Sequence, residues 1–159
     1  MKHKWMARAL SLVMVAAFLP GVVLAESYDL AAGSITVEAE EHGQFVTQEN
    51  NGVKIYDREM QTTDTVIYQS DSENTSTTKT VTIESDVIQN QNGTTTPITA
   101  EVTIENVNID VSGDGKAAIS TTGDGNVTIE LEGENTLISG SAHAGLEKGN
   151  TGNLTIQDQ

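Results

Sequence analysis

The chain has 159 residues, with 8 basic and 23 acidic side chains and no cysteine. The lack of cysteine excludes a disulfide scaffold, a thiolate metal site and a cysteine nucleophile. The excess of acidic side chains argues against nucleic acids and anionic membrane surfaces as partners, because like charges repel.

Residues 1–25 have the pattern of a secretory signal peptide. Three basic residues precede an apolar run from Ala9 to Leu19, and the segment ends in Val-Leu-Ala at Ala25. The apolar run is too short for an ordinary membrane span, and the small residues fit a cleavage site. We therefore predict cleavage after Ala25 and a secreted protein, with a retained membrane anchor as the alternative.

The chain that follows, residues 26–159, is strongly acidic and poor in apolar residues. Its 134 residues keep all 23 acids but only five bases, which gives a net charge of −18, and 21 of them are threonine. A chain of this length can form one core, but few side chains are available to fill it. The negative charge favours cations, or ligands held through cations, as binding partners.

Residues 26–80 show strand-like runs of uneven spacing, so we interpret them as an N-terminal cap or irregular first coils of a repeat protein. The expected strands are 28–32, 34–39, 52–56 and 65–69. Two polar segments, 71–80 and 89–97, are expected to be loops.

Residues 81–159 contain a recurring phrase of valine or leucine, threonine, isoleucine and an acid or amide. It begins at residues 81, 102, 127 and 154. Internal matches pair 106–111 with 131–138, 116–119 with 143–146 and 123–126 with 149–153. Repeats with the spacing of these phrases are typical of a solenoid, in which each unit buries its apolar face against its neighbours.

Within each phrase the side chains alternate, so Val102 and Ile104 should face a core while Thr103 and Glu105 face outward. No segment of the repeats has the apolar period of a helix. We predict an all-β fold, a right-handed parallel β-helix, with an antiparallel sandwich as the alternative. Because the last strand is followed by no cap, we also expect Gln159 to end a fragment.

The segments Gly123–Leu137 and Ser141–Lys148 resemble secreted proteins of Firmicutes that carry the clostridial carbohydrate-binding domain of the parallel β-helix type. The resemblance continues through Glu101–Ser120 and more weakly through Tyr28–Val37, but the Ala-Gly-Ile-Gly-Gly units of that family are absent. It implies a β-helix that binds plant polysaccharides with calcium. It assigns no ligand to a particular residue of this chain.

The acids of the repeat phrase are candidate metal ligands. If the phrases stack in phase, Glu84, Glu105 and Glu130 form one outer column, in which neighbouring carboxylates about 4.8 Å apart repel each other. A bound Ca²⁺ would relieve that repulsion, because this ion takes several oxygen ligands. The alternative is a solvated acidic surface that keeps the sheet soluble.

Three aspartates beside glycine-rich turns are further candidates for calcium binding: Asp110, Asp114 and Asp124. Their spacing fits neither an EF-hand nor a calcium-binding nonapeptide repeat. Asp-Gly pairs are above all turn formers, which is the alternative explanation.

No residue pattern indicates catalysis, so we expect a protein that is not an enzyme. Residues 26–159 contain two histidines, His42 and His143, and no known nucleophile or zinc motif. The expected partner is a polysaccharide or cell-surface glycan, bound without catalysis and with calcium as the candidate cofactor. The alternatives are a structural stalk or adhesin scaffold, and then a polysaccharide lyase or glycosidase.

Overall fold

The computed structural model describes residues 26–61 and 64–158, which form strands and one short 3-10 turn, η1 (Leu30–Ala32). The predicted signal peptide lies outside these residues. Within the described ranges no helix has the length and apolar character needed to cross a membrane. The predicted all-β class is confirmed.

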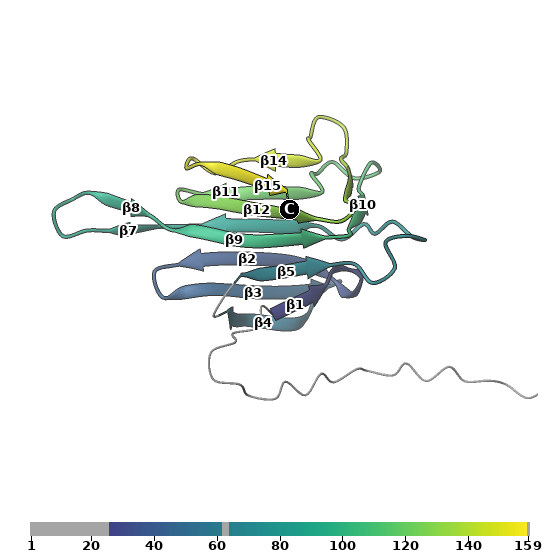
Figure 1. Cartoon of the computed structure of the whole chain (residues 1–159), viewed down its shortest axis with the longest axis horizontal. Helices are drawn as coiled ribbons and strands as arrows, with labels where there is room; N and C mark the ends of the chain where they lie inside the picture. The colour runs from purple at the N-terminus through teal and green to yellow at the C-terminus, as the bar shows by residue number, and fades with distance from the viewer. Residues whose placement is uncertain (1–25, 62–63, 159) are drawn as a thin grey trace, which may run out of the picture.

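Two large sheets dominate the molecule (Figure 1). The five-stranded sheet has the order β1 (Glu26–Asp29), β5 (Thr65–Tyr68), β9 (Thr99–Glu105), β12 (Asn126–Glu132) and β15 (Leu154–Asp158). Every pair in it is parallel. The antiparallel sandwich is therefore wrong for this part of the chain.

The six-stranded sheet combines parallel and antiparallel pairs. Its order is β14 (Leu146–Lys148), β11 (Ile119–Gly123), β6 (Val81–Ser85), β2 (Ser34–Glu40), β3 (Gly43–Asn50) and β4 (Val53–Gln61). The first four strands are parallel, whereas β2, β3 and β4 form an antiparallel meander that ends in the edge strand β4.

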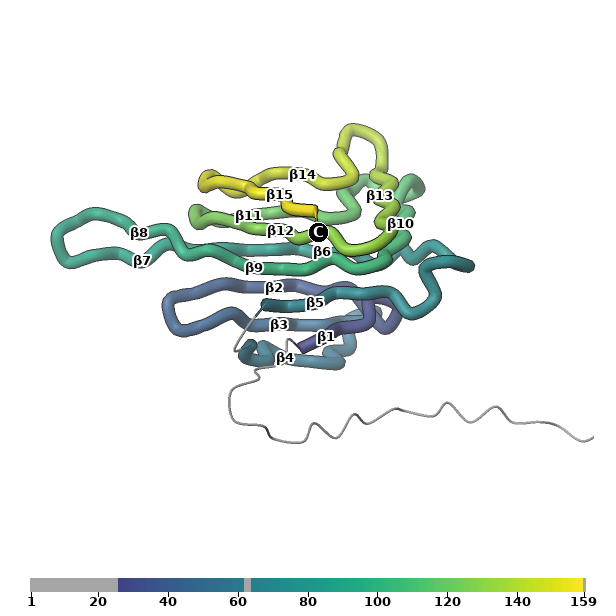
Figure 2. The backbone as a smooth tube through the Cα atoms, viewed as in Figure 1, coloured from purple at the N-terminus to yellow at the C-terminus, as the bar shows by residue number. Residues whose placement is uncertain are grey.

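Two small pairs complete the fold. A parallel pair joins β10 (Asn108–Asp110) to β13 (Thr136–Ile138), and Thr77 bridges to Ile109 beside it. An antiparallel hairpin of β7 (Val87–Gln89) and β8 (Thr95–Pro97) projects from the body of the molecule, as the tube in Figure 2 shows. The chain thus visits the five-, two- and six-stranded sheets in the same order twice, through β9, β10 and β11 and then through β12, β13 and β14.

Strand pairing confirms the internal matches of the repeats. Ile119 pairs with Leu146, Ile109 with Leu137, and Val127 with Leu154. Partners in the last two units are 27 or 28 positions apart, as residues 119 and 146 or 109 and 137 illustrate. This spacing is the length of one unit of the fold.

The four phrases do not form one stack, however, and this part of the prediction is wrong. The phrase at Val81 lies in β6 of the six-stranded sheet, while the other three lie in the five-stranded sheet. Val102 pairs with Ile129 and not with Val127, so the second phrase is displaced by two residues. A shift of two keeps each side chain on its face, which is why the sequence pattern cannot detect it.

The core lies between the sheets and consists mainly of valine and isoleucine. Val102 and Ile104 are buried, as predicted, and so are their counterparts Val81, Ile83, Val127 and Ile129. Strand β2 alternates strictly between buried and half-buried residues, which gives one apolar face and one polar face. β-branched side chains suit this pleated surface.

Residues 26–80 are joined to the repeats through both sheets, since β2 pairs with β6 and β5 pairs with β9. Strand β3 was not expected, and β8 replaces part of the expected loop at 89–97. Both strands lie in antiparallel additions outside the repeating pattern, where no recurring phrase marks them.

Candidate functional site

The predicted column of three glutamates does not form. Glu84 is in β6 of the six-stranded sheet, where it lies between Glu38 and Thr122. Glu105 and Glu130 lie in neighbouring strands of the five-stranded sheet but not opposite each other, because Glu130 pairs with Thr103 and Gln157. The column was predicted on the assumption that the repeat phrases stack in register. Because the phrases are displaced from one another, the three glutamates do not line up.

Acidic pairs form at other positions. Glu105 lies directly opposite Glu132, and Glu38 directly opposite Glu84. The second pair is offset by Arg58, whose guanidinium lies 2.9 Å from Glu38 and 3.0 Å from Glu40. These carboxylates raise the pKa of Arg58, Glu40 by its hydrogen bond and Glu38 by its charge. No ion pair of this kind is found at Glu105 or Glu132 within the part of the chain that is described.

The three aspartates are occupied by local contacts. Asp110 accepts a 2.9 Å hydrogen bond from the Ser112 amide, and hydrogen bonds from Ser112 lower its pKa. Asp114 lies 3.3 Å from the Lys116 ammonium. Asp124 accepts a 3.0 Å hydrogen bond from the Thr151 hydroxyl. The structure does not bring the three together, and their contacts fit the turn-forming role.

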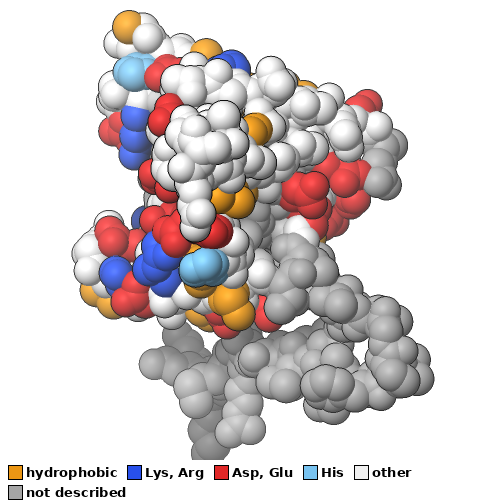
Figure 3. Space-filling model, turned by 90° about the vertical axis from the view of Figure 1, so that its left-hand side faces the viewer, with side chains coloured by type: hydrophobic (Ala, Val, Ile, Leu, Met, Phe, Trp, Pro, Cys, Tyr) orange, Lys and Arg blue, Asp and Glu red, His pale blue; other side chains and the backbone are white. Residues whose placement is uncertain are grey.

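Within residues 26–61 and 64–158, no group of three or more histidine, aspartate or glutamate side chains is placed to hold a metal ion. One polar hollow nevertheless contains carboxylate oxygens that are buried and have no hydrogen-bond partner. This acidic hollow, of about 260 Å³, lies on the outer face of the five-stranded sheet and is lined by Asp64, Glu101, Val102, Thr128, Glu130 and Gln157. Figure 3 shows acidic side chains on both sides of the view, interspersed with basic ones on the left and gathered in a separate group on the right.

In the acidic hollow, one oxygen of each of two carboxylates is buried without a hydrogen-bond partner. The atoms are Asp64 Oδ1 and Glu130 Oε1. The other oxygen of Asp64 accepts a 2.6 Å hydrogen bond from Thr103, which pairs with Glu130 across the strands. Burying an unpaired charged oxygen is costly, so a bound cation is favoured here. A calcium ion bound here would need hydroxyl, amide or water oxygens besides the two carboxylates.

A larger hollow, which we call the asparagine groove, opens where the strands of the five-stranded sheet end. Its main part, about 380 Å³, is lined by Ser72, Glu73, Asn106, Val107, Asn108, Glu134 and Thr136. A second part of about 260 Å³ shares Ser72, Glu73 and Asn106 and extends over the loop 69–74. The volume of the main part is within the range of small-molecule sites, about 300–1,000 Å³.

Hydrogen bonds between successive units fix the floor of the asparagine groove. Asn106 Oδ1 accepts from the Glu134 amide at 3.1 Å, and Asn135 Oδ1 accepts from the Val107 amide at 3.0 Å. The Asn108 amide donates to the buried Gln69 at 2.9 Å. Asn106 has a φ of 49°, a conformation that asparagine tolerates better than most residues. These bonds hold the groove in shape before any ligand arrives.

Two carboxylates of the groove, Glu73 and Glu134, make no side-chain hydrogen bond to another described residue. Together with Ser72 and Thr136 they supply free acceptors and hydroxyl groups. Sequence reasoning placed Ser72 and Glu73 in a polar loop and attached no role to the groove residues. The asparagines are typical of turns and could have indicated turns at these positions. They could not have indicated the groove, because it is formed by a loop and two units that are distant in the sequence and meet only in the fold.

Three of the four aromatic side chains of the described residues lie on β1, β3 and β4. Tyr28 and Tyr56 pack edge to face with ring centroids 5.3 Å apart, and Arg58 lies 4.7 Å above the ring of Phe45. None of them lines the asparagine groove or the acidic hollow. Any sugar bound in the groove would therefore be held by hydrogen bonds and not by stacking.

Comparison of the chain with models of protein families, with curated proteins and with solved structures found no match.

Proposed function

We propose that the chain is a secreted right-handed parallel β-helix module that binds carbohydrate without catalysis, with calcium as its cofactor. The repeated order of visits to three sheets, with units of 27 or 28 residues, supports the β-helix. The signal-like segment 1–25 supports secretion, and the resemblance of Gly123–Lys148 to clostridial carbohydrate-binding proteins supports the ligand class.

The observation that carries this proposal is the asparagine groove. A sugar presents many hydroxyl groups, each of which donates one hydrogen bond and accepts others. Glu73 and Glu134 offer acceptors for those hydroxyls, and Ser72 and Thr136 offer both donors and acceptors. Because the floor is already hydrogen-bonded, binding costs little ordering of the protein.

Calcium enters the proposal through the acidic hollow. A cation between Asp64 and Glu130 satisfies the two buried oxygens and lowers the negative charge of the sheet. Ca²⁺ bound to the folded chain alone adds about 2.7 kcal/mol of stability at a hundredfold excess over its dissociation constant. Its effect on the groove is indirect, because the two hollows share no lining residue.

The experiment is a glycan array probed with the purified protein in millimolar Ca²⁺ and in chelator, followed by calorimetry with any glycan that binds. We expect Glu134→Gln and Glu73→Gln to weaken binding about tenfold each, the effect of roughly one charged hydrogen bond. Glu41→Gln, in the exposed turn between β2 and β3, is the matched control. Binding to no glycan in either condition would overturn the proposal in favour of a structural stalk.

The calcium part is tested separately by thermal unfolding. Wild type should melt several degrees higher in millimolar Ca²⁺ than in chelator, whereas Asp64→Asn and Glu130→Gln should lose most of that difference. Glu41→Gln again serves as the control and should keep it. An unchanged wild-type midpoint would remove calcium from the proposal and leave glycan binding by the groove to stand or fall on the array.

A further inference from the structure

Two Asn-Gly pairs occur in the chain, Asn51-Gly52 and Asn92-Gly93, and each lies in the turn of a β-hairpin. All four residues are exposed. A Cβ atom at either glycine would meet nothing within 4 Å, so no neighbouring group crowds the two turns. The two pairs thus share their sequence and their exposure, and they differ in their hydrogen bonds.

The first pair forms the two-residue turn between β3 and β4. Asn50 pairs with Val53, and the residues between them, Asn51 and Gly52, have φ values of 52° and 78°. A positive φ at both central positions is the pattern of a type I′ turn, which Asn-Gly favours. No hydrogen bond joins the Asn51 side chain or the Gly52 amide to another described residue.

The second pair is held by hydrogen bonds within the loop between β7 and β8. Asn92 Oδ1 accepts from the Thr94 amide at 3.0 Å and from the Thr94 hydroxyl at 2.7 Å. The Gly93 amide donates to the Asn90 carbonyl at 3.0 Å. The side-chain amide of Asn92 and the backbone N–H that follows it are therefore both engaged.

From this difference we propose that Asn51 is a site of spontaneous modification, at which deamidation yields aspartate and isoaspartate, while Asn92 is protected. The Gly52 nitrogen gives its proton to hydroxide and attacks the carbonyl carbon of the Asn51 side chain. A C–N bond forms, the side-chain nitrogen takes up a proton from water and leaves as ammonia, and a succinimide ring remains. Water then adds to either ring carbonyl and opens the ring.

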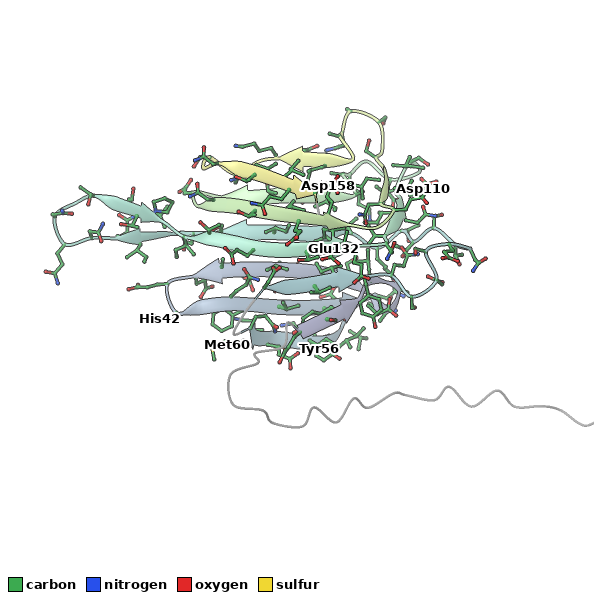
Figure 4. All side chains as sticks on the ribbon, in the orientation of Figure 1. His42, Tyr56, Met60, Asp110, Glu132 and Asp158 are labelled. Carbon is green, nitrogen blue, oxygen red and sulfur yellow. The ribbon has the colours of Figure 1, made fainter. Side chains whose placement is uncertain are left out.

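The position of the turn at the edge of the sheet favours this reaction. Ring closure requires the Gly52 nitrogen to approach the Asn51 side chain, and this movement needs the turn to open. Strand β4 pairs only with β3, and two irregularities interrupt that pairing, so local opening costs little. Figure 4 shows β4, marked by Tyr56 and Met60, with no further strand beyond it. Opening at Asn92 must in addition break the three hydrogen bonds of its loop.

The two products change the turn in different ways. Aspartate adds one negative charge, whereas isoaspartate carries the main chain through its side-chain carbon and lengthens the turn by one methylene. The register of a hairpin depends on the length and type of its turn. Isoaspartate should therefore loosen the pairing of β4 with β3 as the protein ages, and the amides of β4 should then exchange hydrogen faster.

Mass spectrometry of the purified protein, incubated at mildly alkaline pH and sampled over weeks, tests the proposal. We expect both products to accumulate at residue 51 at least about tenfold faster than at residue 92, the effect of one or two hydrogen bonds. The same incubation in guanidinium chloride is the control, because the unfolded chain lacks those bonds and the two pairs should then react at similar rates. Equal rates in the folded protein, or aspartate without isoaspartate at residue 51, would overturn the proposal.

A second experiment examines why Asn92 is protected. Thr94→Val removes the hydroxyl that donates to Asn92 and keeps the backbone amide and the shape of the side chain. Deamidation at residue 92 should become faster in this variant, while the rate at residue 51 stays unchanged, and circular dichroism checks that the variant folds. A rate at residue 92 that stayed the same or fell would contradict the protection on which the proposal rests.

Discussion

Glu105 of β9 and Glu132 of β12 lie directly opposite each other in a parallel pair, with no basic residue of the described chain forming an ion pair with either. Like charges at such positions destabilise a sheet by about 0.2–1 kcal/mol. The pair of Glu38 and Glu84 has the same geometry, but Arg58 contacts Glu38 there. The repulsion between Glu105 and Glu132 in the five-stranded sheet is therefore not offset, whereas Arg58 offsets the repulsion between Glu38 and Glu84 in the six-stranded sheet.

Replacing Glu132 with glutamine should remove this repulsion and raise the free energy of unfolding by about 0.2–1 kcal/mol at low salt. The gain should shrink in high salt, since ions screen the charges. Chemical denaturation in chelator at both salt concentrations measures it, with Glu41→Gln as the control. An equal gain in that control would mean that only the overall charge matters.

The buried column of the five-stranded sheet makes a sharper prediction. Ile104 is fully buried and Ile156 is 52% exposed, although both occupy the isoleucine position of the repeat phrase. Ile104→Asp should unfold the chain, because a buried unpaired carboxylate costs several kcal/mol, a large part of the total stability of a domain. Ile156→Asp should melt close to wild type. Circular dichroism measures the melting of both variants. If the two melted alike, the inward assignment of Ile104 would be wrong.

Two glycines that both precede an aspartate offer a matched pair of variants. Gly123 has a φ of 89°, and a Cβ atom there would lie 2.2 Å from the Ser85 carbonyl oxygen. A Cβ at Gly113 would meet nothing within 4 Å. Gly123→Ala should therefore cost at least about 1–3 kcal/mol, whereas Gly113→Ala should change stability by less than about 1 kcal/mol. Urea denaturation separates the two, and equal losses would contradict the close packing of β11 against β6.

Tyr28 predicts how stability changes at alkaline pH. Burial, and then the nearby Glu59 and Glu26, raise its pKa far above the ordinary value of 10.0. Its hydroxyl contacts Gln61 and donates to Glu59 at 3.2 Å. Because the folded state disfavours the phenolate, this contribution to stability is complete below about pH 10, where the unfolded tyrosine titrates, and is lost as the pH rises further.

Tyr28→Phe should remove that part of the alkaline loss, although it also loses the hydrogen bonds at neutral pH. The free energy of unfolding, measured by denaturation between pH 7 and 11, should therefore fall less steeply in the variant than in wild type. Parallel curves for the two proteins would show that Tyr28 does not cause the loss.

The sequence was sufficient to predict the core face of the repeats and some of their strand pairs. The alternation of Val102 and Ile104 with polar neighbours identified the core face, and the match of residue 119 with residue 146 identified a strand pair. Both follow from a period of two within strands and from recurrence of the unit. A shift of two residues between phrases leaves that alternation intact, so the exact opposition of Glu105 and Glu132 could not be predicted.

The candidate site was less accessible to prediction for the same physical reason. Glu130 was singled out, but its neighbour in the acidic hollow, Asp64, precedes β5 and lies outside the repeats. The asparagine groove likewise joins Glu73 of an irregular loop to Glu134 of a later unit. Contacts between a repeat and a non-repeating segment leave no period in the sequence, so only the folded chain reveals them.

The projecting hairpin of β7 and β8 shows how the fold tolerates inserted chain. The chain leaves the six-stranded sheet after Ser85 and enters the five-stranded sheet in β9, just after Ile98. At this point the Ser85 hydroxyl donates a 2.8 Å hydrogen bond to the Ile98 carbonyl. The two ends of the excursion are thus fastened to each other, and the strands on either side pair as if it were absent. A fluorescent protein or an affinity tag inserted at Gly93, in the tip of the hairpin, would be separated from the two sheets by this hydrogen-bonded base. The hairpin is therefore a suitable insertion site for a fused domain.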